Sequence, residues 1–177
     1  MNLDAINLLV LDVDGVLTDG AIVMSESGSL IKAFDAQDGY ALKLWQRAGH
    51  EVAIISGRET PVVAQRAAEL GIKAVRQSCS DKLAVYERLL ETLGSNDAAV
   101  CYVGDDLPDL PPMRRCAFPV AVANAVPGVK QVAQYVTRRC GGTGAVAETI
   151  ERILRKQRRG DEVQGPTSKV QNRRSLS

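Results

Sequence analysis

The sequence predicts an α/β fold, a three-layer Rossmann-like arrangement in which helices cover both faces of a mostly parallel sheet. Short apolar runs of strand length alternate with helical patterns from residue 6 to residue 157. Aromatic residues make up only 4% of the chain, so the core must come mainly from Val, Leu, Ile and Ala, which suits a buried parallel sheet. The chain of 177 residues is long enough for one sizeable core.

Each element follows from local signals. Strands are expected where apolar runs lie between turn residues, at 6–12, 51–56, 72–75, 98–104 and 118–123. Helices are expected where apolar residues recur at helical spacing, at 39–49, 60–71, 80–94 and 144–157. Thr60 and Pro61 fit the start of the second helix, and a glycine ends each of the first three.

The segment 21–34 interrupts this alternation. Two short β-rich runs flank Ser-Glu-Ser-Gly-Ser, which predicts a projecting hairpin that cannot easily join the parallel sheet. On a monomer the hairpin would expose its apolar residues, which are Ile22, Val23, Met24, Leu30, Ile31 and Phe34. Exposed apolar patches usually meet a partner, so we interpret the hairpin as an oligomerisation element.

The two ends of the chain differ in charge. Residues 155–177 hold seven of the 22 Lys and Arg residues but only two of the 21 Asp and Glu residues, so this end is basic and the rest is acidic. Composition therefore predicts a domain of residues 1–157 and a basic, flexible tail of residues 158–177. A solvated tail is favoured over one that binds nucleic acid or an acidic neighbour.

Other residue counts limit the class of protein. Four cysteines without CxxC spacing indicate a reduced, cytoplasmic protein, with Cys101 as a small core residue. No apolar run approaches the length of a membrane span, and Asp4 interrupts the region where a signal peptide would lie, so no membrane partner is expected. Because His50 is the only histidine, histidine relays and histidine-rich metal sites are nearly excluded.

Polar residues gather where the predicted strands end, and the carboxyl ends of parallel strands share one edge of a sheet. The first strand ends in Asp12 and Asp14, the second in residues 56–58, and the fourth in residues 104–106, with Asp109 beyond. A few hard oxygen ligands, with room for phosphate oxygens, favour Mg²⁺ over Ca²⁺ or Zn²⁺. The ion would offset the repulsion between the neighbouring acids.

A phosphoryl group suits the remaining polar residues at this edge. Lys82 lies in the first turn of the helix that follows the third strand, and Ser56 ends the second strand. Without a histidine relay or a Walker-type glycine loop, a carboxylate is the candidate nucleophile. We predict that Asp12 attacks phosphorus to form an aspartyl-phosphate, and that Asp14 protonates the leaving alcohol and then activates water.

Two simpler interpretations of DVDGVLTDG compete with this one. A calcium loop that starts at Asp12 fails, because Leu17 stands where glycine is needed and Val23 where a bidentate glutamate belongs. A non-functional acidic turn would explain one DxDG motif. It does not explain four matching pieces in the correct order on predicted strand ends.

The motifs DVDGVLTDG, ISGR, DK and GDDLPDL resemble those of the haloacid dehalogenase superfamily of aspartate-nucleophile phosphatases. With FDAQDGYALK and YVTRRCGGTGAVAE included, residues 6–154 are similar to one branch, the 3-deoxy-D-manno-octulosonate 8-phosphate phosphatases. The resemblance implies a Mg²⁺-dependent, capless homotetramer that releases phosphate from a keto-sugar acid during lipopolysaccharide precursor synthesis. A small-molecule substrate is therefore favoured over nucleic acid.

The resemblance also implies roles at the predicted metal site. Asp12, the backbone carbonyl of Asp14, and Asp105 would hold Mg²⁺. Asp106 and Asp109 would orient the groups around the ion, unless Asp109 simply caps the following helix.

For the substrate, the resemblance assigns the phosphoryl group to Ser56 and Lys82. Arg58 and Arg66 lie eight residues apart and could project from one helix face, although a solvated helix surface would also explain them. The full set of expected substrate contacts is Asp14, Asp35, Ala36, Gln37, Asp38, Gly39, Lys43, Gly57, Arg58, Arg66 and Lys82.

The spacing of the motifs predicts a capless enzyme without reference to the family. Neither the gap between Asp14 and Ser56 nor the gap between Lys82 and Asp105 can hold a lid domain. An open site admits water and selects a small substrate poorly, so a neighbouring subunit must supply the roof. The hairpin and the basic tail are the parts available for this.

Two positions depart from the family pattern. Gln37 stands where the family usually has Arg or Lys, and Ala147 where it has Arg, with Thr143 at a variable position. Both changes remove positive charge near the expected sugar-acid site or the subunit roof, and an arginine contact to a carboxylate is worth on the order of 1.5–3 kcal/mol. A nine-carbon sialic-acid-type phosphate is therefore the nearest alternative to the octulosonate ester.

Two alternatives lie outside this substrate class. An open site and a basic tail would also allow a phosphatase for a nucleotide or a macromolecule. A non-catalytic, oligomeric interaction domain is the other alternative, and the intact set of Asp12, Asp14, Ser56, Lys82 and Asp105 argues against it.

Overall fold

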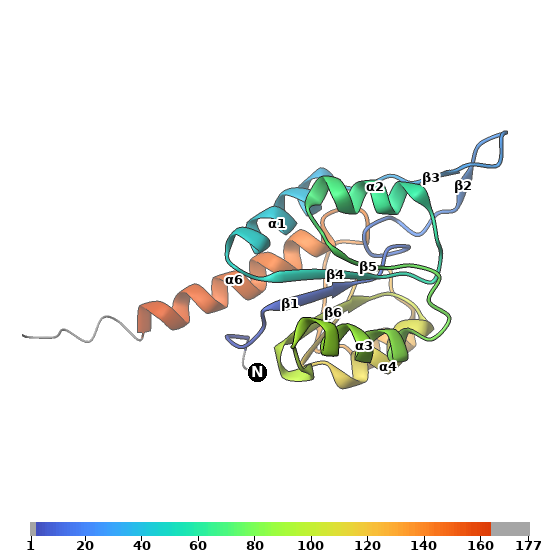
Figure 1. The fold of residues 1–177 in the computed structure, drawn as a ribbon. Helices are drawn as coiled ribbons and strands as arrows, with labels where there is room; N and C mark the ends of the chain where they lie inside the picture. Colours follow the sequence, from blue (N-terminus) through green and yellow to red (C-terminus); the bar gives the residue numbers. More distant parts are fainter. Residues whose placement is uncertain (1–2, 164–177) are drawn as a thin grey trace, which may run out of the picture.

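The computed structural model describes residues 3–163, and side chains as far as residue 157. One sheet of six parallel strands has the order β5-β4-β1-β6-β7-β8 (Figure 1). The strand bounds are β1 Leu8–Leu11, β4 Glu51–Ile55, β5 Ala74–Arg76, β6 Val100–Gly104, β7 Phe118–Ala121 and β8 Tyr135–Val136. From β1 the chain builds the sheet first toward β5 and later toward β8. The switch point of the sheet therefore lies between the carboxyl ends of β1 and β6.

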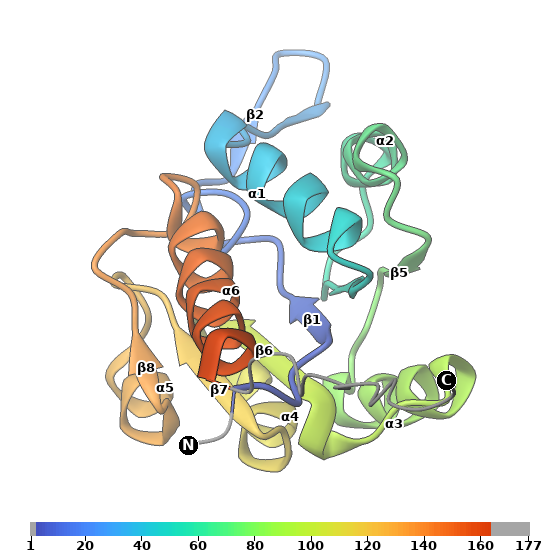
Figure 2. The same ribbon diagram turned by 90° about the vertical axis from the view of Figure 1, so that its left-hand side faces the viewer.

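Helices cover both faces of this sheet (Figures 1 and 2). One face carries α1 (Ala36–Arg47), α2 (Pro61–Leu70) and α6 (Ala145–Val163). The other face carries α3 (Lys82–Leu93), α4 (Leu110–Arg115) and α5 (Pro127–Val132). Two 3₁₀ turns, η1 (Asp97–Ala99) and η2 (Leu107–Asp109), precede β6 and α4. The predicted three-layer α/β fold is confirmed.

The three central strands, β1, β4 and β6, are almost wholly buried, so charged side chains lie only at or beyond their ends. The four residues of β1 are exposed by 1% or less. In the sheet register Leu11 lies opposite Ile54 of β4 and Val103 of β6, so the three strands end at nearly the same level. The residues that follow these strands, which the sequence places as Asp12, Ser56 and Asp105, therefore emerge together at one edge.

The element boundaries differ from the predictions where side-chain capping decides them. The helix predicted at 39–49 begins at Ala36, because Asp35 accepts hydrogen bonds from the backbone amides of Gln37 and Asp38. Sequence reasoning did not predict α5 or β8, and it anticipated α4 only as a helix after Asp109, without bounds. These elements have two to six residues, too few to show a helical or a strand period.

The predicted hairpin is confirmed as β2 (Val23–Met24) paired antiparallel with β3 (Leu30–Ile31), separate from the main sheet. It projects beyond the body of the molecule (Figure 1). Its exposed apolar residues are Ile22 (45% exposed), Val23 (48%), Met24 (64%) and Ile31 (54%). Leu30 and Phe34, also predicted to be exposed, are half-buried. Apart from this hairpin, residues 3–163 contain no inserted segment that could form a lid domain.

The C-terminal part of the described chain is helical. Helix α6 continues to Val163, and residues 164–177 of the predicted tail lie outside the described residues. The division into a domain of residues 1–157 and a flexible tail remains a prediction. Among the described helices, none is both long enough and apolar enough to cross a bilayer. Cys101 is fully buried, as predicted for a core residue, and all four cysteines are free.

Candidate active site

Three carboxylates converge at the switch point of the sheet, where β1 and β6 end. One oxygen from each of Asp12, Asp105 and Asp109 lies within 4.8 Å of the other two. Asp12 is 7% exposed and Asp109 is 0% exposed, so two of these charges are largely removed from water. Like charges this close repel one another unless cations and hydrogen-bond donors offset the repulsion.

Asp109 is held by four donors. Its Oδ1 accepts hydrogen bonds from Lys82 Nζ at 2.7 Å and from the Tyr102 hydroxyl at 2.9 Å. Its Oδ2 accepts hydrogen bonds from the backbone amides of Asp105 at 3.1 Å and Asp106 at 3.3 Å. The side chain makes no capping bond to α4. With both oxygens engaged, Asp109 is suited to the orienting role predicted for it, and it fixes the loop that carries Asp105.

Lys82 is the first residue of α3, and Asp81 caps that helix. The Lys82 Nζ lies 2.9 Å from Asp12 Oδ2 as well as 2.7 Å from Asp109 Oδ1, with the side chain 5% exposed. Burial lowers the pKa of Lys82, but the charges of Asp12 and Asp109 outweigh burial and raise that pKa above its ordinary value. Lys82 is therefore an ammonium cation that joins two of the three acids.

Lys82 does not neutralise the whole cluster. Burial and the charge of Asp109 raise the pKa of Asp12 to about 6 in spite of Lys82. Burial and the charges of Asp12 and Asp109 raise the pKa of Asp105 to about 8. The Oδ1 atom of Asp105 is buried without a hydrogen-bond partner. A buried oxygen without a donor, beside a second carboxylate, is what a hard divalent cation requires, so these residues fit Mg²⁺.

The DVDGVLTDG loop passes so close to its neighbours that glycine is required at two places. A Cβ atom at Gly15, which has φ of +91°, would lie 2.0 Å from Asp105 Oδ2. A Cβ atom at Gly141 would lie 1.7 Å from the carbonyl oxygen of Gly15. Gly141 and Gly142 therefore pack directly against the backbone of this loop.

Asp14 lies between two cations from different parts of the chain. It forms an ion pair with Lys32, and its Oδ2 lies 3.7 Å from Arg58 Nε. Lys32 follows β3, and its side chain is 3% exposed, whereas the Arg58 side chain is 56% exposed. Sequence reasoning missed Lys32. The alternation of side chains along a strand was the available signal, because it turns Lys32 to the face away from that of the exposed Ile31.

Ser56, Gly57 and Arg58 form the turn after β4. Ser56 is 2% exposed, and its backbone amide donates to the carbonyl of Arg76, which extends the pairing with β5. The Ser56 Oγ accepts a hydrogen bond from the Arg58 amide at 3.4 Å. The structure thus places this turn at the same sheet edge as Asp12, as the sequence predicted.

The predicted sugar-acid contacts on α1 are divided between solvent and the interior. Ala36, Gln37 and Lys43 are exposed, whereas Asp38 and Gly39 are buried. Asp38 Oδ1 accepts a hydrogen bond from the Ala147 amide of α6 at 2.7 Å, and Asp38 Oδ2 is buried without a partner. Burial raises the pKa of Asp38 to about 6. Asp38 therefore ties α1 to the start of α6, a structural contact that the sequence did not indicate.

Arg58 and Arg66 do not share a helix, contrary to one prediction, because α2 begins only at Pro61. The Arg66 guanidinium lies 5.6 Å from the ring of Phe34. It donates to the Asp35 carbonyl at 3.4 Å and pairs with Glu69 at 2.9 Å. Arg66 therefore joins α2 to the start of α1.

Gln37, one of the two departures from the family pattern, has a cationic neighbour. Arg139 Nη1 donates a hydrogen bond to Gln37 Oε1 at 2.6 Å. Arg139 is exposed and belongs to the loop between β8 and α6. A positive charge thus stands beside position 37, although it comes from another segment, and sequence reasoning did not single it out.

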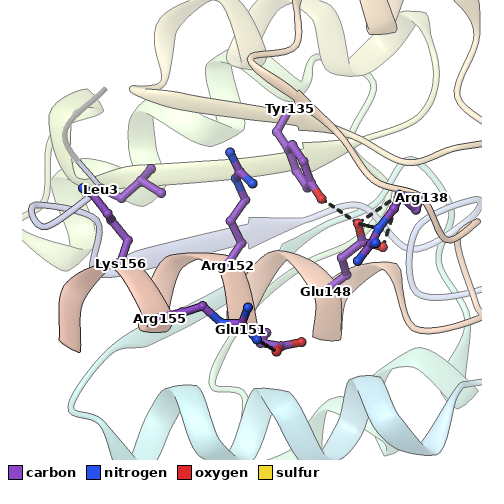
Figure 3. A pocket seen from close by; sticks show the side chains of 8 residues that line it. All are labelled: Leu3, Tyr135, Arg138, Glu148, Glu151, Arg152, Arg155 and Lys156. Atoms are coloured by element: carbon purple, nitrogen blue, oxygen red, sulfur yellow. Dashed lines mark hydrogen bonds and ion pairs between the residues drawn. The ribbon is translucent and has the colours of Figure 1, made fainter. Parts of the chain in front are cut away.

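A separate pocket of about 370 Å³ lies between β8, α6 and the N-terminal segment, and none of the predicted site residues lines it. Its residues are Leu3, Tyr135, Arg138, Glu148, Glu151, Arg152, Arg155 and Lys156 (Figure 3). Several of its polar side chains contact each other. Glu148 accepts the Tyr135 hydroxyl at 2.6 Å, Arg152 stacks on the Tyr135 ring at 4.2 Å, and Arg155 pairs with Glu151.

Comparison with known proteins identifies the family. A model of haloacid dehalogenase-like hydrolases matches residues 75–150. The 3-deoxy-D-manno-octulosonate 8-phosphate phosphatase KdsC of Escherichia coli (strain K12) is 46% identical over 160 residues, which cover 90% of this chain and 85% of that protein. The chain belongs to the 3-deoxy-D-manno-octulosonate 8-phosphate phosphatase family.

Solved structures of this phosphatase family share the fold. The phosphatase from Yersinia pestis is 44% identical with a TM-score of 0.86, covering 88% of this chain and 84% of that chain. The phosphatase from Moraxella catarrhalis, solved with a magnesium ion, a phosphate ion and a KDO molecule, is 40% identical with a TM-score of 0.86. That comparison covers 92% of this chain and 93% of the other.

Proposed function

We propose that this chain is a Mg²⁺-dependent phosphatase that hydrolyses 3-deoxy-D-manno-octulosonate 8-phosphate through an aspartyl-phosphate. The position of Asp12 carries the proposal. This buried carboxylate ends the central strand, contacts Lys82 at 2.9 Å, and lies beside Asp105, which has a buried oxygen without a partner. The family of the chain and the ligands named for the Moraxella catarrhalis structure support the metal and the substrate.

In the first step the Asp12 carboxylate attacks phosphorus, and the bond between phosphorus and the ester oxygen of the sugar acid breaks. Asp14, in its protonated form, gives its proton to that oxygen, which leaves as the alcohol. In the second step Asp14 takes a proton from water while the water oxygen attacks phosphorus. The bond between phosphorus and Asp12 then breaks, which releases phosphate and restores the carboxylate.

Lys82 and Ser56 would bind the phosphoryl oxygens, and Asp109 would hold Lys82 in place through its 2.7 Å contact. Asp12, the Asp14 carbonyl and Asp105 would hold Mg²⁺. When bound, the ion offsets the negative charge of these acids and of the phosphoryl group, so that one anion can approach another.

The sugar acid carries a carboxylate, and three arginines contact residues that were predicted to bind the substrate. Arg58 lies beside Asp14, the guanidinium of Arg66 on α2 contacts the start of α1, and Arg139 lies beside Gln37. The positive charge beside Gln37 belongs to Arg139, so it does not lie where an Arg or Lys at position 37 would place it. A related nine-carbon sugar-acid phosphate is for this reason the second candidate substrate.

We further propose that the protein is a cytoplasmic homotetramer. The exposed apolar residues of the hairpin support assembly, and the absence of a lid domain within residues 3–163 leaves the site in need of a neighbouring roof. The four free cysteines support a reducing compartment.

A phosphate-release assay with purified protein tests the proposed function. The substrates are 3-deoxy-D-manno-octulosonate 8-phosphate, a nine-carbon sialic-acid-type phosphate and a nucleoside monophosphate, each with Mg²⁺ and with a chelator. We expect the octulosonate ester to give the highest kcat/KM, with hydrolysis lost in the chelator. A higher kcat/KM for the nine-carbon ester would make that ester the proposed substrate. Turnover that persists in the chelator would contradict the Mg²⁺ site.

A further inference from the structure

Within the described residues, the hairpin reaches the active site through Lys32. The Lys32 side chain is 3% exposed, whereas that of its neighbour Ile31 points outward and the residue is 54% exposed. Because side chains alternate across a strand, one face of this segment is turned to solvent while the other delivers a buried ammonium group to Asp14. A buried lysine is costly unless it is paired, so the contact with Asp14 determines where this side chain can lie.

Lys32 and Arg58 hold opposite sides of the Asp14 carboxylate. Lys32 Nζ donates to Asp14 Oδ1, and Arg58 Nε lies 3.7 Å from Oδ2. Arg58 is 56% exposed, so its hold on Asp14 is weakened by solvent. Among the described residues, Lys32 is thus the buried cation that sets the orientation of the Asp14 side chain.

We propose that Lys32 is a positioning residue that holds Asp14 for proton transfer and thereby ties the projecting hairpin to catalysis. The proposal rests on the proposed function, because it concerns the proton that Asp14 gives to the leaving oxygen. A small displacement of a catalytic group can cost about 10²-fold in rate. Lys32 acts through Asp14 and not on the reacting atoms themselves.

The experiment compares two esters whose leaving groups differ. The alkoxide of 3-deoxy-D-manno-octulosonate 8-phosphate needs a proton from Asp14 to leave, whereas the phenolate of p-nitrophenyl phosphate leaves without one. The variant is Lys32→Met, which removes the charge and keeps an unbranched side chain of similar length. Lys73→Met, at an exposed position on the surface, is the matched control.

We expect Lys32→Met to lower kcat/KM for the octulosonate ester by about 10²-fold and for p-nitrophenyl phosphate by less than about threefold. Equal losses with both esters, or no loss with either, would overturn the proposal. A purely structural role of Lys32 in the hairpin predicts equal losses. Size-exclusion chromatography of both variants shows whether assembly is unchanged.

A double-mutant cycle with Asp14→Asn gives a second, independent measurement. If Lys32 acts through Asp14, then Lys32→Met has little further effect on octulosonate ester hydrolysis once Asp14 is replaced. The same 10²-fold loss in both backgrounds, on the order expected for proton transfer, would also overturn the proposal. If the unmodified protein hydrolyses neither ester, the proposed function fails, which is a different result from either outcome for Lys32.

Discussion

The carboxylate cluster at the ends of β1 and β6 and the pocket beside α6 are both rich in charge, but their charges are satisfied in different ways. In the cluster, Asp12 and Asp109 are buried and share Lys82, and Asp105 keeps a buried oxygen without a partner. In the pocket, Glu148 is held by Tyr135 and by neighbouring backbone amides, and Arg155 pairs with Glu151 one turn away at an exposed position.

We infer from this comparison that buried charge without a partner, rather than a hollow in the surface, marks the site of chemistry. Exposed ion pairs contribute about 0–1 kcal/mol each and need no ligand. In the cluster, in contrast, burial and neighbouring like charges raise the pKa of Asp12 and Asp105. The remaining negative charge is one that a bound cation can offset.

Asp12→Asn should lower kcat for phosphate release by about 10⁴-fold or more, because it removes the nucleophile. The fold should persist, since the amide has the shape of the carboxylate and one buried charge is lost, and circular dichroism checks this. Glu151→Gln is the control, because it removes one carboxylate from the α6 pocket and should leave kcat within about twofold. Turnover by Asp12→Asn near the wild-type rate would contradict the assignment of the nucleophile.

Lys82→Met leaves Asp12 and Asp109 buried without their shared cation. We expect a loss of about 3–5 kcal/mol in the free energy of unfolding, measured with urea in Mg²⁺-free buffer. We also expect kcat to fall by about 10²–10³-fold, because one contact to the phosphoryl group is lost. An unchanged free energy of unfolding would show that Lys82 does not neutralise the cluster.

The stability of the metal-free protein should depend on pH in a defined direction. The pKa of Asp12 is raised to about 6 and that of Asp105 to about 8, so the folded state favours their protonated forms. Their contribution to stability is present below about pH 4 and is lost as pH rises toward 8. Thermal melts with a chelator and with Mg²⁺ should therefore differ more at pH 8 than at pH 5. A Mg²⁺-induced change in Tm that is equal at both values would contradict the cation site.

The sequence predicted the sheet edge well because strand ends carry their own signals. Asp12, Ser56 and Asp105 each follow an apolar run directly, so the fold class alone brings them together. Asp109 is different, since its four donors come from three segments and its burial follows only from the packed structure. Lys32 and Arg139 were missed for a related reason. Alternation along β3 indicates the face on which Lys32 lies, but no local pattern reveals that Lys32 contacts Asp14 or that Arg139 contacts Gln37, because the partners are far apart in the chain.

Arg139→Ala should affect substrate binding more than chemistry. Arg139 is exposed and bonds to Gln37, at the position where the family usually carries a positive charge. If it attracts the sugar-acid carboxylate, its loss should raise KM by about tenfold with kcat nearly unchanged, as expected for one charged contact. The measurement is a set of initial rates with the octulosonate ester, and Arg88→Ala, at an exposed position on α3, is the control. Equal KM values for the two variants would remove Arg139 from substrate recognition.

Arg152→Ala should have the smallest effect. It tests whether the pocket beside α6, unlike the carboxylate cluster, has no part in catalysis. The guanidinium stacks on the Tyr135 ring at 4.2 Å, but Arg152 is exposed, so its loss should lower the free energy of unfolding by at most about 1 kcal/mol. Because Tyr135 remains bonded to Glu148, the pocket keeps its shape, and both kcat and KM should stay within about twofold of wild type. A tenfold loss of activity, on the order of 1.4 kcal/mol, would mean that the pocket takes part in catalysis. In that case, buried charge without a partner would not distinguish the site of chemistry from an ordinary charged surface in this protein.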